Sequence, residues 1–197
     1  ERSLVVGGGE CGGELVLERT FAVNVLAPFV VTSLLLPLLT ARDGSRIVFV
    51  SSMSQCDEIV DWEDGFMKRC EGGDYSAHRA YSESKLMDAM LSNEFAERLS
   101  PLGCKRITVN ALDPGTVNTK MLLEGWGPCG IDVEDALDET WIASSEELDG
   151  VSGKYFVGRI EHPPGRSARD SEQRKRLWGI LSELAPDDVD KAWDKVL

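Results

Sequence analysis

A tyrosine and a lysine stand four residues apart in the segment Tyr81-Ser82-Glu83-Ser84-Lys85. On a helix, residues at this spacing lie on one face about one turn apart, so the lysine ammonium can approach the phenol of the tyrosine. A nearby positive charge favours the ionised phenolate, which lets the tyrosine work as a general acid or base near neutral pH. The pair therefore indicates proton transfer to or from a substrate oxygen.

Other positions that could take part in chemistry surround this pair in the sequence. An apolar run typical of a buried strand ends at Ser52, a second one leads to Pro114-Gly115, and Asn24 interrupts an apolar helical stretch. Ligands of open parallel sheets bind outside the carboxyl ends of the strands. Ser52 is therefore a candidate hydrogen-bond donor to the substrate oxygen, and Ser51 is its rival for that contact.

In their order and context these segments resemble the short-chain dehydrogenase/reductase family, whose members pass a hydride between a nicotinamide dinucleotide and a carbonyl or alcohol. The matching pieces are the Asn24 helix, the strand ending at Ser52, Tyr81-x-x-x-Lys85 and Asn110-Ala111-x-x-Pro114-Gly115-x-Val117. The chain is most similar to the retinol-dehydrogenase-like branch in three features: the long interval from Ser52 to Tyr81, the context Ala80 to Leu86, and Gly153-Lys154-Tyr155-Phe156 followed by Leu177-Trp178. The resemblance extends from about Phe21 to the end of the chain.

The resemblance implies a role for each matching residue. Tyr81 would be the general acid or base, and Lys85 would both support it and hydrogen-bond the nicotinamide ribose. Ser52 would donate to the substrate oxygen, and Asn24 would hold a water that relays protons to Lys85. The cofactor-binding residues would be Tyr81, Lys85 and the segment that receives the nicotinamide carboxamide: Pro114, Gly115, Val117 and Thr119. The resemblance favours NADP over NAD but leaves the choice open.

Each candidate also has a purely structural interpretation. Tyr81 could be a packing tyrosine beside a solvated Lys85, Ser52 a strand-end cap, Asn24 a structural amide, and Pro114-Gly115 a simple turn. The sequence alone leaves these alternatives open.

Other residues give weaker indications. His78 and His162 are isolated in the sequence and suggest neither a catalytic triad nor a metal site. Trp126 and Trp141 fall in the region that covers the substrate in the family. They could line an apolar pocket, or they could pack in the core or in a lid.

Helical and strand-like segments alternate along the chain, which predicts an α/β fold with a parallel sheet and crossover helices. We expect the C-terminal part of a Rossmann-type doubly wound parallel sheet. Strands are predicted at 46–51, 106–112 and 154–157, and helices at 18–39, 80–99, 171–184 and 187–196, with a long functional loop at 53–79. The single partial domain would comprise a loop (1–17), a catalytic core (18–115), a substrate-covering region (116–150) and a C-terminal strand with helices (151–197).

The glycine-rich segment 7–12 satisfies the pattern G-x-G-x-x-G and follows the apolar run 4–6. This pattern can mark a loop that binds a dinucleotide pyrophosphate at a helix N-terminus. We reject that interpretation because the window that should supply an acid for the ribose, 24–36, contains none. The family's cofactor-binding front half is therefore expected to be missing. The competing hypothesis is a truncated, non-catalytic interaction or dimerisation module that cannot bind cofactor.

Composition narrows the range of partners and compartments. The net charge of −13 and the pI near 4.6 argue against nucleic acid and anionic membrane surfaces. The cysteines are odd in number and lack C-x-x-C spacing, which favours free thiols in a reducing, most simply cytoplasmic, compartment over disulfides or zinc. The partner that the family resemblance implies is a small, lipophilic carbonyl or alcohol.

The apolar stretch 23–39 approaches the length of a membrane span, but we interpret it as a buried or interface helix and expect no transmembrane span. The family pairs this helix and the one at 80–99 across a two-fold axis. We therefore expect a homo-oligomer, with Met90 as an outward-facing apolar position on the second helix.

Overall fold

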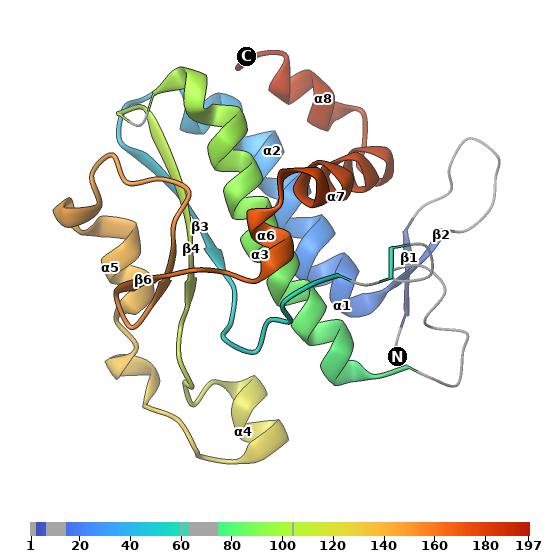
Figure 1. The fold of residues 1–197 in the computed structure, drawn as a ribbon, viewed down its shortest axis with the longest axis vertical. Coiled ribbons are helices and arrows are strands. Elements are labelled where there is room, and N and C mark those ends of the chain that lie inside the picture. The colour runs from blue at the N-terminus through green and yellow to red at the C-terminus, as the bar shows by residue number, and fades with distance from the viewer. Residues whose placement is uncertain (1–2, 7–14, 60, 63–74, 104) are drawn as a thin grey trace.

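The structure is a computed structural model that describes residues 3–6, 15–59, 61–62, 75–103 and 105–197. A four-stranded sheet of order β3-β4-β5-β6 lies at its centre, and helices cover both faces (Figure 1). The strands β3, β4 and β5 are parallel to one another, and β6 is antiparallel to β5. The strand bounds are β3 Ser45–Val50, β4 Ile107–Asp113, β5 Tyr155–Val157 and β6 Ile160–His162.

Two long helical segments lie on one face of the sheet, and β3 connects them in the sequence (Figure 1). The first runs unbroken from Arg19 to Leu39 and consists of α1, a π-helical turn η1, and α2; the second is α3. The helix bounds are α1 Arg19–Phe21, η1 Ala22–Leu26, α2 Ala27–Leu39, α3 Ala77–Leu99, α4 Lys120–Trp126, α5 Asp138–Ser144, α6 Arg166–Arg169, α7 Ser171–Leu184 and α8 Asp188–Trp193, and short 3-10 turns occupy Ser100–Leu102, Val133–Asp135 and Glu146–Leu148.

The predicted α/β architecture is confirmed. The three strands predicted from apolar runs lie within one residue of β3, β4 and β5. The helix predicted at 171–184 coincides with α7, and the one at 80–99 begins slightly earlier, at Ala77, because the Ser76 hydroxyl caps its first turn by accepting from Arg79 N–H.

The main core lies between the sheet and the helices α2, α3, α7 and α8. Phe95 of α3 is fully buried at its centre, with ring centroids 5.7 Å from Phe49 of β3 and 6.0 Å from Phe29 of α2. Trp178 of α7 and Trp193 of α8 close the cluster from the side away from the sheet, at 4.9 and 5.6 Å from the Phe95 ring. Burial of these aromatic rings fixes how α3 lies over the strands.

A smaller core covers the opposite face of the sheet. Ile142 of α5 is buried there against Leu112 of β4 and Phe156 of β5. Apolar cover on both faces explains why all residues of β4 are buried.

The prediction that residues 1–17 form a loop was wrong in two places. Ser3–Val6 forms β1 and Leu15–Glu18 forms β2, and the two strands pair antiparallel. Both are short runs of residues with high β-propensity that flank a glycine-rich segment, so each can satisfy the other's backbone groups. The rejected glycine motif, 7–12, lies outside the described residues.

The choice of Met90 as an outward position on α3 was also wrong, since its side chain is fully buried. The sheet covers one side of α3, while α6 and α7 pack on another. In contrast, α2 and η1 expose a set of apolar side chains: Val23, Val31, Leu34, Leu35 and Leu38. The helix Arg19–Leu39 is long and apolar enough to cross a membrane by length and composition, with 33% of the tested window buried inside the protein.

Candidate functional site

Lys85 lies where α3 crosses the carboxyl end of β3. Its ammonium Nζ donates to the carbonyl of Val50, the last residue of that strand, at 2.9 Å, and to Asp88 Oδ2, also at 2.9 Å. The same Nζ is 5.8 Å from the centre of the Tyr81 ring. The structure thus brings the predicted Tyr–Lys pair together beside the strand end that leads to Ser52.

The two rival serines differ in what their hydroxyls do. Ser51 is buried, and its hydroxyl donates to the Lys85 carbonyl at 2.7 Å, which ties the strand end to α3. Ser52 is partly exposed, and its hydroxyl accepts from Ser54 N–H at 3.1 Å. An accepting hydroxyl still has its own proton to donate. The geometry therefore favours Ser52 over Ser51 as the donor to a substrate oxygen.

Asn24 lies inside the π-helical turn η1. Its amide donates to the Ser84 hydroxyl at 3.1 Å, and Ser84 in turn donates to the Tyr81 carbonyl at 2.8 Å. Single π-helical turns inside longer helices are frequent at functional sites. The predicted Asn24 is thus joined to the same turn of α3 that carries Tyr81 and Lys85.

Asp113, at the end of β4, connects two parts of the site. Its buried carboxylate accepts from the Met53 N–H, next to Ser52, and from the Gly115 N–H in the loop that follows β4. The register of β3 and β4 pairs Val50 with Leu112, so both strand ends lie at one edge of the sheet. A single carboxylate therefore fixes the Ser52 loop relative to the Pro114 loop.

The remaining predicted residues lie along that second loop. Pro114 is partly exposed, and Gly115 is exposed with φ +74°, a conformation that favours glycine. Val117 is buried and forms a parallel bridge with Ile131, while the Thr119 hydroxyl caps α4. All four positions follow β4 at the carboxyl edge of the sheet, which is where the predicted nicotinamide segment should lie.

Tyr155 of β5, which pairs with Ala111 of β4, also lies near this edge of the sheet. Burial, together with the nearby Asp113 carboxylate, raises the pKa of Tyr155 to about 12. Tyr155 therefore keeps its proton near neutral pH and is a poor candidate for the proton-transfer residue.

Other residues singled out in the sequence lie elsewhere or serve packing. His78 and His162 are exposed on separate elements, and no cluster of possible metal ligands occurs in the described part of the chain. Trp141 packs edge-on against Phe156 at 5.3 Å, so it belongs to the smaller core. Cys56 and Cys129 are free thiols, and the other cysteines lie outside the described residues.

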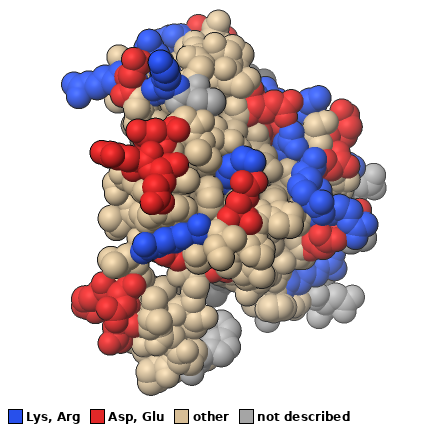
Figure 2. Space-filling view, turned by 60° about the vertical axis from the view of Figure 1, so that its left-hand side comes forward, with Lys and Arg blue, Asp and Glu red and all other residues tan. Residues whose placement is uncertain are grey.

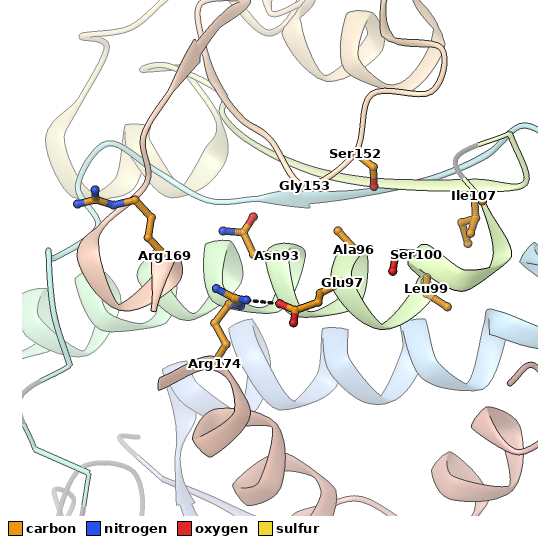
Figure 3. A pocket seen from close by; sticks show the side chains of 11 residues that line it. Asn93, Ala96, Glu97, Leu99, Ser100, Ile107, Ser152, Gly153, Arg169 and Arg174 are labelled. Carbon is orange, nitrogen blue, oxygen red and sulfur yellow. Dashed lines mark hydrogen bonds and ion pairs between the residues drawn. The ribbon is translucent and has the colours of Figure 1, made fainter. Parts of the chain in front are cut away.

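A cavity of about 470 Å³ lies at the opposite end of α3 (Figure 3). It is bordered by Asn93 and Ser100 of the helix region and by Ser152 from the turn before β5. Arg174 lines it too, but its guanidinium is paired with both Glu94 and Glu97. The cavity is separate from Tyr81 and Lys85 and shares no residue with the predicted site.

The charged surface is mixed. On the face shown in Figure 2, acidic side chains form separate groups between uncharged areas and basic side chains, and the coloured atoms of this face show no continuous basic surface. This distribution gives no support to a polyanionic partner on this face.

Sequence comparisons relate the chain to curated dehydrogenases. It is 35% identical over 185 residues to retinol dehydrogenase 13 of Mus musculus, a match that covers 85% of this chain and 53% of the relative. Retinol dehydrogenase 14 of Homo sapiens and polyprenol dehydrogenase of Mus musculus are each 33% identical over 177 residues, covering 83% and 82% of this chain and 51% of each relative. The chain thus spans about half the length of these relatives. No family model matches it.

Solved structures share the fold. A putative uncharacterized protein from Mycobacterium paratuberculosis superposes with a TM-score of 0.61 at 25% identity, covering 85% of this chain and 58% of that one. A short chain dehydrogenase from Salmonella enterica subsp. enterica serovar Typhi has a TM-score of 0.52 at 22% identity, covering 70% of this chain and 51% of that one. The Rossmann-type assignment is therefore confirmed.

We predict that Asp113→Ala loosens both site loops. The change removes two charge-assisted hydrogen bonds from buried surroundings and should lower the free energy of unfolding by about 2–3 kcal/mol. Urea unfolding measures this, with Asp188→Ala as the matched control because that carboxylate forms an exposed ion pair on α8. If the two variants lost equal stability, Asp113 would not fix these loops.

Proposed function

The chain belongs to the short-chain dehydrogenase/reductase family, in its retinol-dehydrogenase-like branch, and we propose that the protein transfers a hydride between NAD(P) and a carbonyl or alcohol substrate with Tyr81 as general acid or base. The observation that carries the proposal is the position of Lys85. It is bound to the end of β3 and lies 5.8 Å from the Tyr81 ring, beside the loop that bears Ser52.

In the reducing direction the substrate oxygen gains a proton as its carbon gains a hydride. Tyr81 donates that proton and becomes a phenolate, and the reverse transfer occurs when an alcohol is oxidised. The Lys85 ammonium, whose Nζ lies 5.8 Å from the centre of the Tyr81 ring, is the positive charge that would support this transfer. Ser52 would hold the substrate oxygen by donating to it, and Asn24 would position a water that returns a proton toward Lys85.

The described residues fit the nicotinamide end of the cofactor. The Lys85 ammonium has three N–H donors, and the described contacts to Val50 and Asp88 use two of them. The remaining donor is available for a ribose hydroxyl, and the segment from Pro114 to Thr119 lies at the same edge of the sheet. When bound, the nicotinamide would supply or accept the hydride. NADP is the favoured form by resemblance, with NAD as the alternative.

The proposed substrate is a small lipophilic alcohol or carbonyl. Exposed apolar side chains are concentrated in the proposed substrate-covering region, directly after the Pro114 loop: Met121, Leu123, Ile131, Val133 and Leu137. Such a surface suits an apolar ligand, and it gives a reason beyond the relatives' names to expect one. A reducing intracellular compartment remains our proposal for the location.

The first of three predictions from the proposed function concerns Tyr81 and Lys85. In a version of the protein completed with the family's N-terminal cofactor-binding segment, Tyr81→Phe should lower kcat about 100- to 10,000-fold while leaving NAD(P)H affinity largely unchanged. Lys85→Met should reduce both, because the lysine serves both groups. Steady-state kinetics and fluorescence titration separate the two effects.

The matched control is Tyr75→Phe, which removes a hydroxyl that donates to Glu18 and lies outside the proposed machinery. This control should keep its turnover. Near-normal turnover in Tyr81→Phe would end the assignment of Tyr81.

The second prediction concerns cofactor binding by the chain itself. The sequence predicts very weak affinity for NADH and NADPH, because most of the anchoring in the family comes from pyrophosphate and adenosine contacts. Calorimetric titration of the purified chain tests this. Micromolar binding would reinstate the glycine segment 7–12 as a phosphate loop, whereas no binding would be the result expected of the alternative, a non-catalytic dimerisation module.

The third prediction concerns self-association. We propose that the exposed apolar face of α2 pairs with a second copy of the chain, as the family resemblance implies. Leu35→Glu should dissociate the assembly, because it places a charge on that face, and light scattering measures the mass. Leu123→Glu on α4 introduces the same charge at a similarly exposed leucine and should leave the mass unchanged. A monomer for the unmodified protein would contradict this prediction.

A further inference from the structure

Asp88 is a buried acid placed one helical turn after Lys85. Its side chain is 5% exposed, and Oδ2 accepts from Lys85 Nζ at 2.9 Å. The lysine also donates to the Val50 carbonyl, so two fixed contacts determine where its ammonium lies. When it is ionised, the Asp88 carboxylate carries a negative charge that offsets the positive charge of the lysine.

The surroundings of Asp88 are unusually apolar for an ionised carboxylate. It stands within the run Leu86 to Leu91, whose other members are at most 1% exposed. Burial of a carboxylate is costly unless a partner compensates it. Desolvation raises the pKa of Asp88 to about 7, although the Lys85 charge and hydrogen bond act in the opposite direction. Both protonation states of Asp88 are therefore populated near neutral pH.

Within the described residues, the neighbouring elements bring no second charge that shifts the pKa of Asp88. In the described part of the protein, Lys85 of the same helix is the charged side chain that acts on it. On β3 the Val50 carbonyl binds the lysine. The Asn24 amide of η1 is uncharged and binds Ser84, and the Asp113 carboxylate at the end of β4 acts on Tyr155. The electrostatic effect of the Lys85 ammonium thus depends on whether Asp88 carries a proton.

We propose that Asp88 is a positioning residue that controls, through its own protonation, how much of the Lys85 charge reaches Tyr81. The inference rests on the proposed role of the Tyr81–Lys85 pair. Ionised Asp88 holds the ammonium and offsets its charge, which weakens the support for the Tyr81 phenolate. When Asp88 is protonated, it no longer offsets the lysine charge, and the full positive charge of the ammonium then favours the Tyr81 phenolate. The site therefore contains three coupled groups rather than two.

The direct test is NMR of this chain with 13C-labelled tyrosine rings. The Tyr81 signal, assigned from its loss in Tyr81→Phe, should show an inflection between about pH 6 and 8 as Asp88 titrates. Asp88→Asn should abolish that inflection, because the amide keeps the shape but has no proton to exchange in this range. Lys85→Met should abolish it too, because the charge that links Asp88 to Tyr81 is gone.

The matched control is Glu97→Gln, at the far end of α3 beside Arg174. It also replaces a paired acid by an amide, and it should retain the Tyr81 inflection. A flat Tyr81 titration in the unmodified chain, or an inflection that persists in Asp88→Asn, would overturn the proposal. If Asp88→Asn did not fold, Lys85→Met and the unmodified chain would still decide the matter.

Stability gives an independent readout. A carboxyl whose folded pKa lies near 7 is protonated in the folded state where the unfolded chain, with a pKa near 3.9, is ionised. The unfolded state then binds fewer protons between about pH 4 and 7, so Asp88 lowers stability progressively as pH rises through that window. The urea midpoint of Asp88→Asn, measured relative to that of the unmodified chain, should therefore rise between pH 4 and pH 8. A pH-independent difference would contradict the titration of Asp88.

The outcomes separate this inference from the proposed function. A Tyr81 inflection that depends on Asp88, in a completed protein without turnover, would support the coupling and refute the dehydrogenase. Turnover that depends on Tyr81 without such an inflection would support the dehydrogenase and refute the role of Asp88.

Discussion

The hydrogen bond from the Lys85 ammonium to the Val50 carbonyl joins the long helix α3 to the carboxyl end of β3. The return bond from the Ser51 hydroxyl to the Lys85 carbonyl fixes the same junction from the other side. Phe95, buried further along the helix, packs against Phe49 of β3, so the core holds α3 over the sheet at a second point. The geometry of the Tyr–Lys pair is therefore set by the packing of the whole domain.

The parallel pairing of β3 with β4 brings a second loop to this junction. β4 ends beside β3, so the loop that follows it arrives at the same edge, where Asp113 binds backbone groups of both loops. Parts of the chain far apart in sequence meet there because all parallel strands end on one side. Helix α3 also carries Asp88 into the core, and this places a titratable group behind the ammonium.

Sequence reasoning predicted the elements and the proton-transfer pair because both depend on local spacing. It missed Asp88 and Asp113, whose importance depends on burial; the available signal was an acid within or at the end of an apolar run. The expected pairing of this helix across a two-fold axis placed Met90 outward, but α3 is covered by the sheet on one side and by α6 and α7 on another, so its apolar residues are buried within the chain itself. The pairing of β1 with β2 was missed because it depends on contact between two short segments that are separated in the sequence, and neither segment alone predicts it.

The π-helical turn at Ala22–Leu26 bears on how this helix tolerates insertion and deletion. A π-helical turn holds one residue more than an α-helical turn, and each residue of an α-helix rotates the chain by about 100°. Loss of a single residue there would restore regular α-helix and swing the Asn24 amide away from Ser84, or else turn the apolar surface of α2 to a new direction. The extra residue thus changes the rotation between the two ends of the helix, so that Asn24 faces Ser84 while the apolar side chains of α2 keep their own direction.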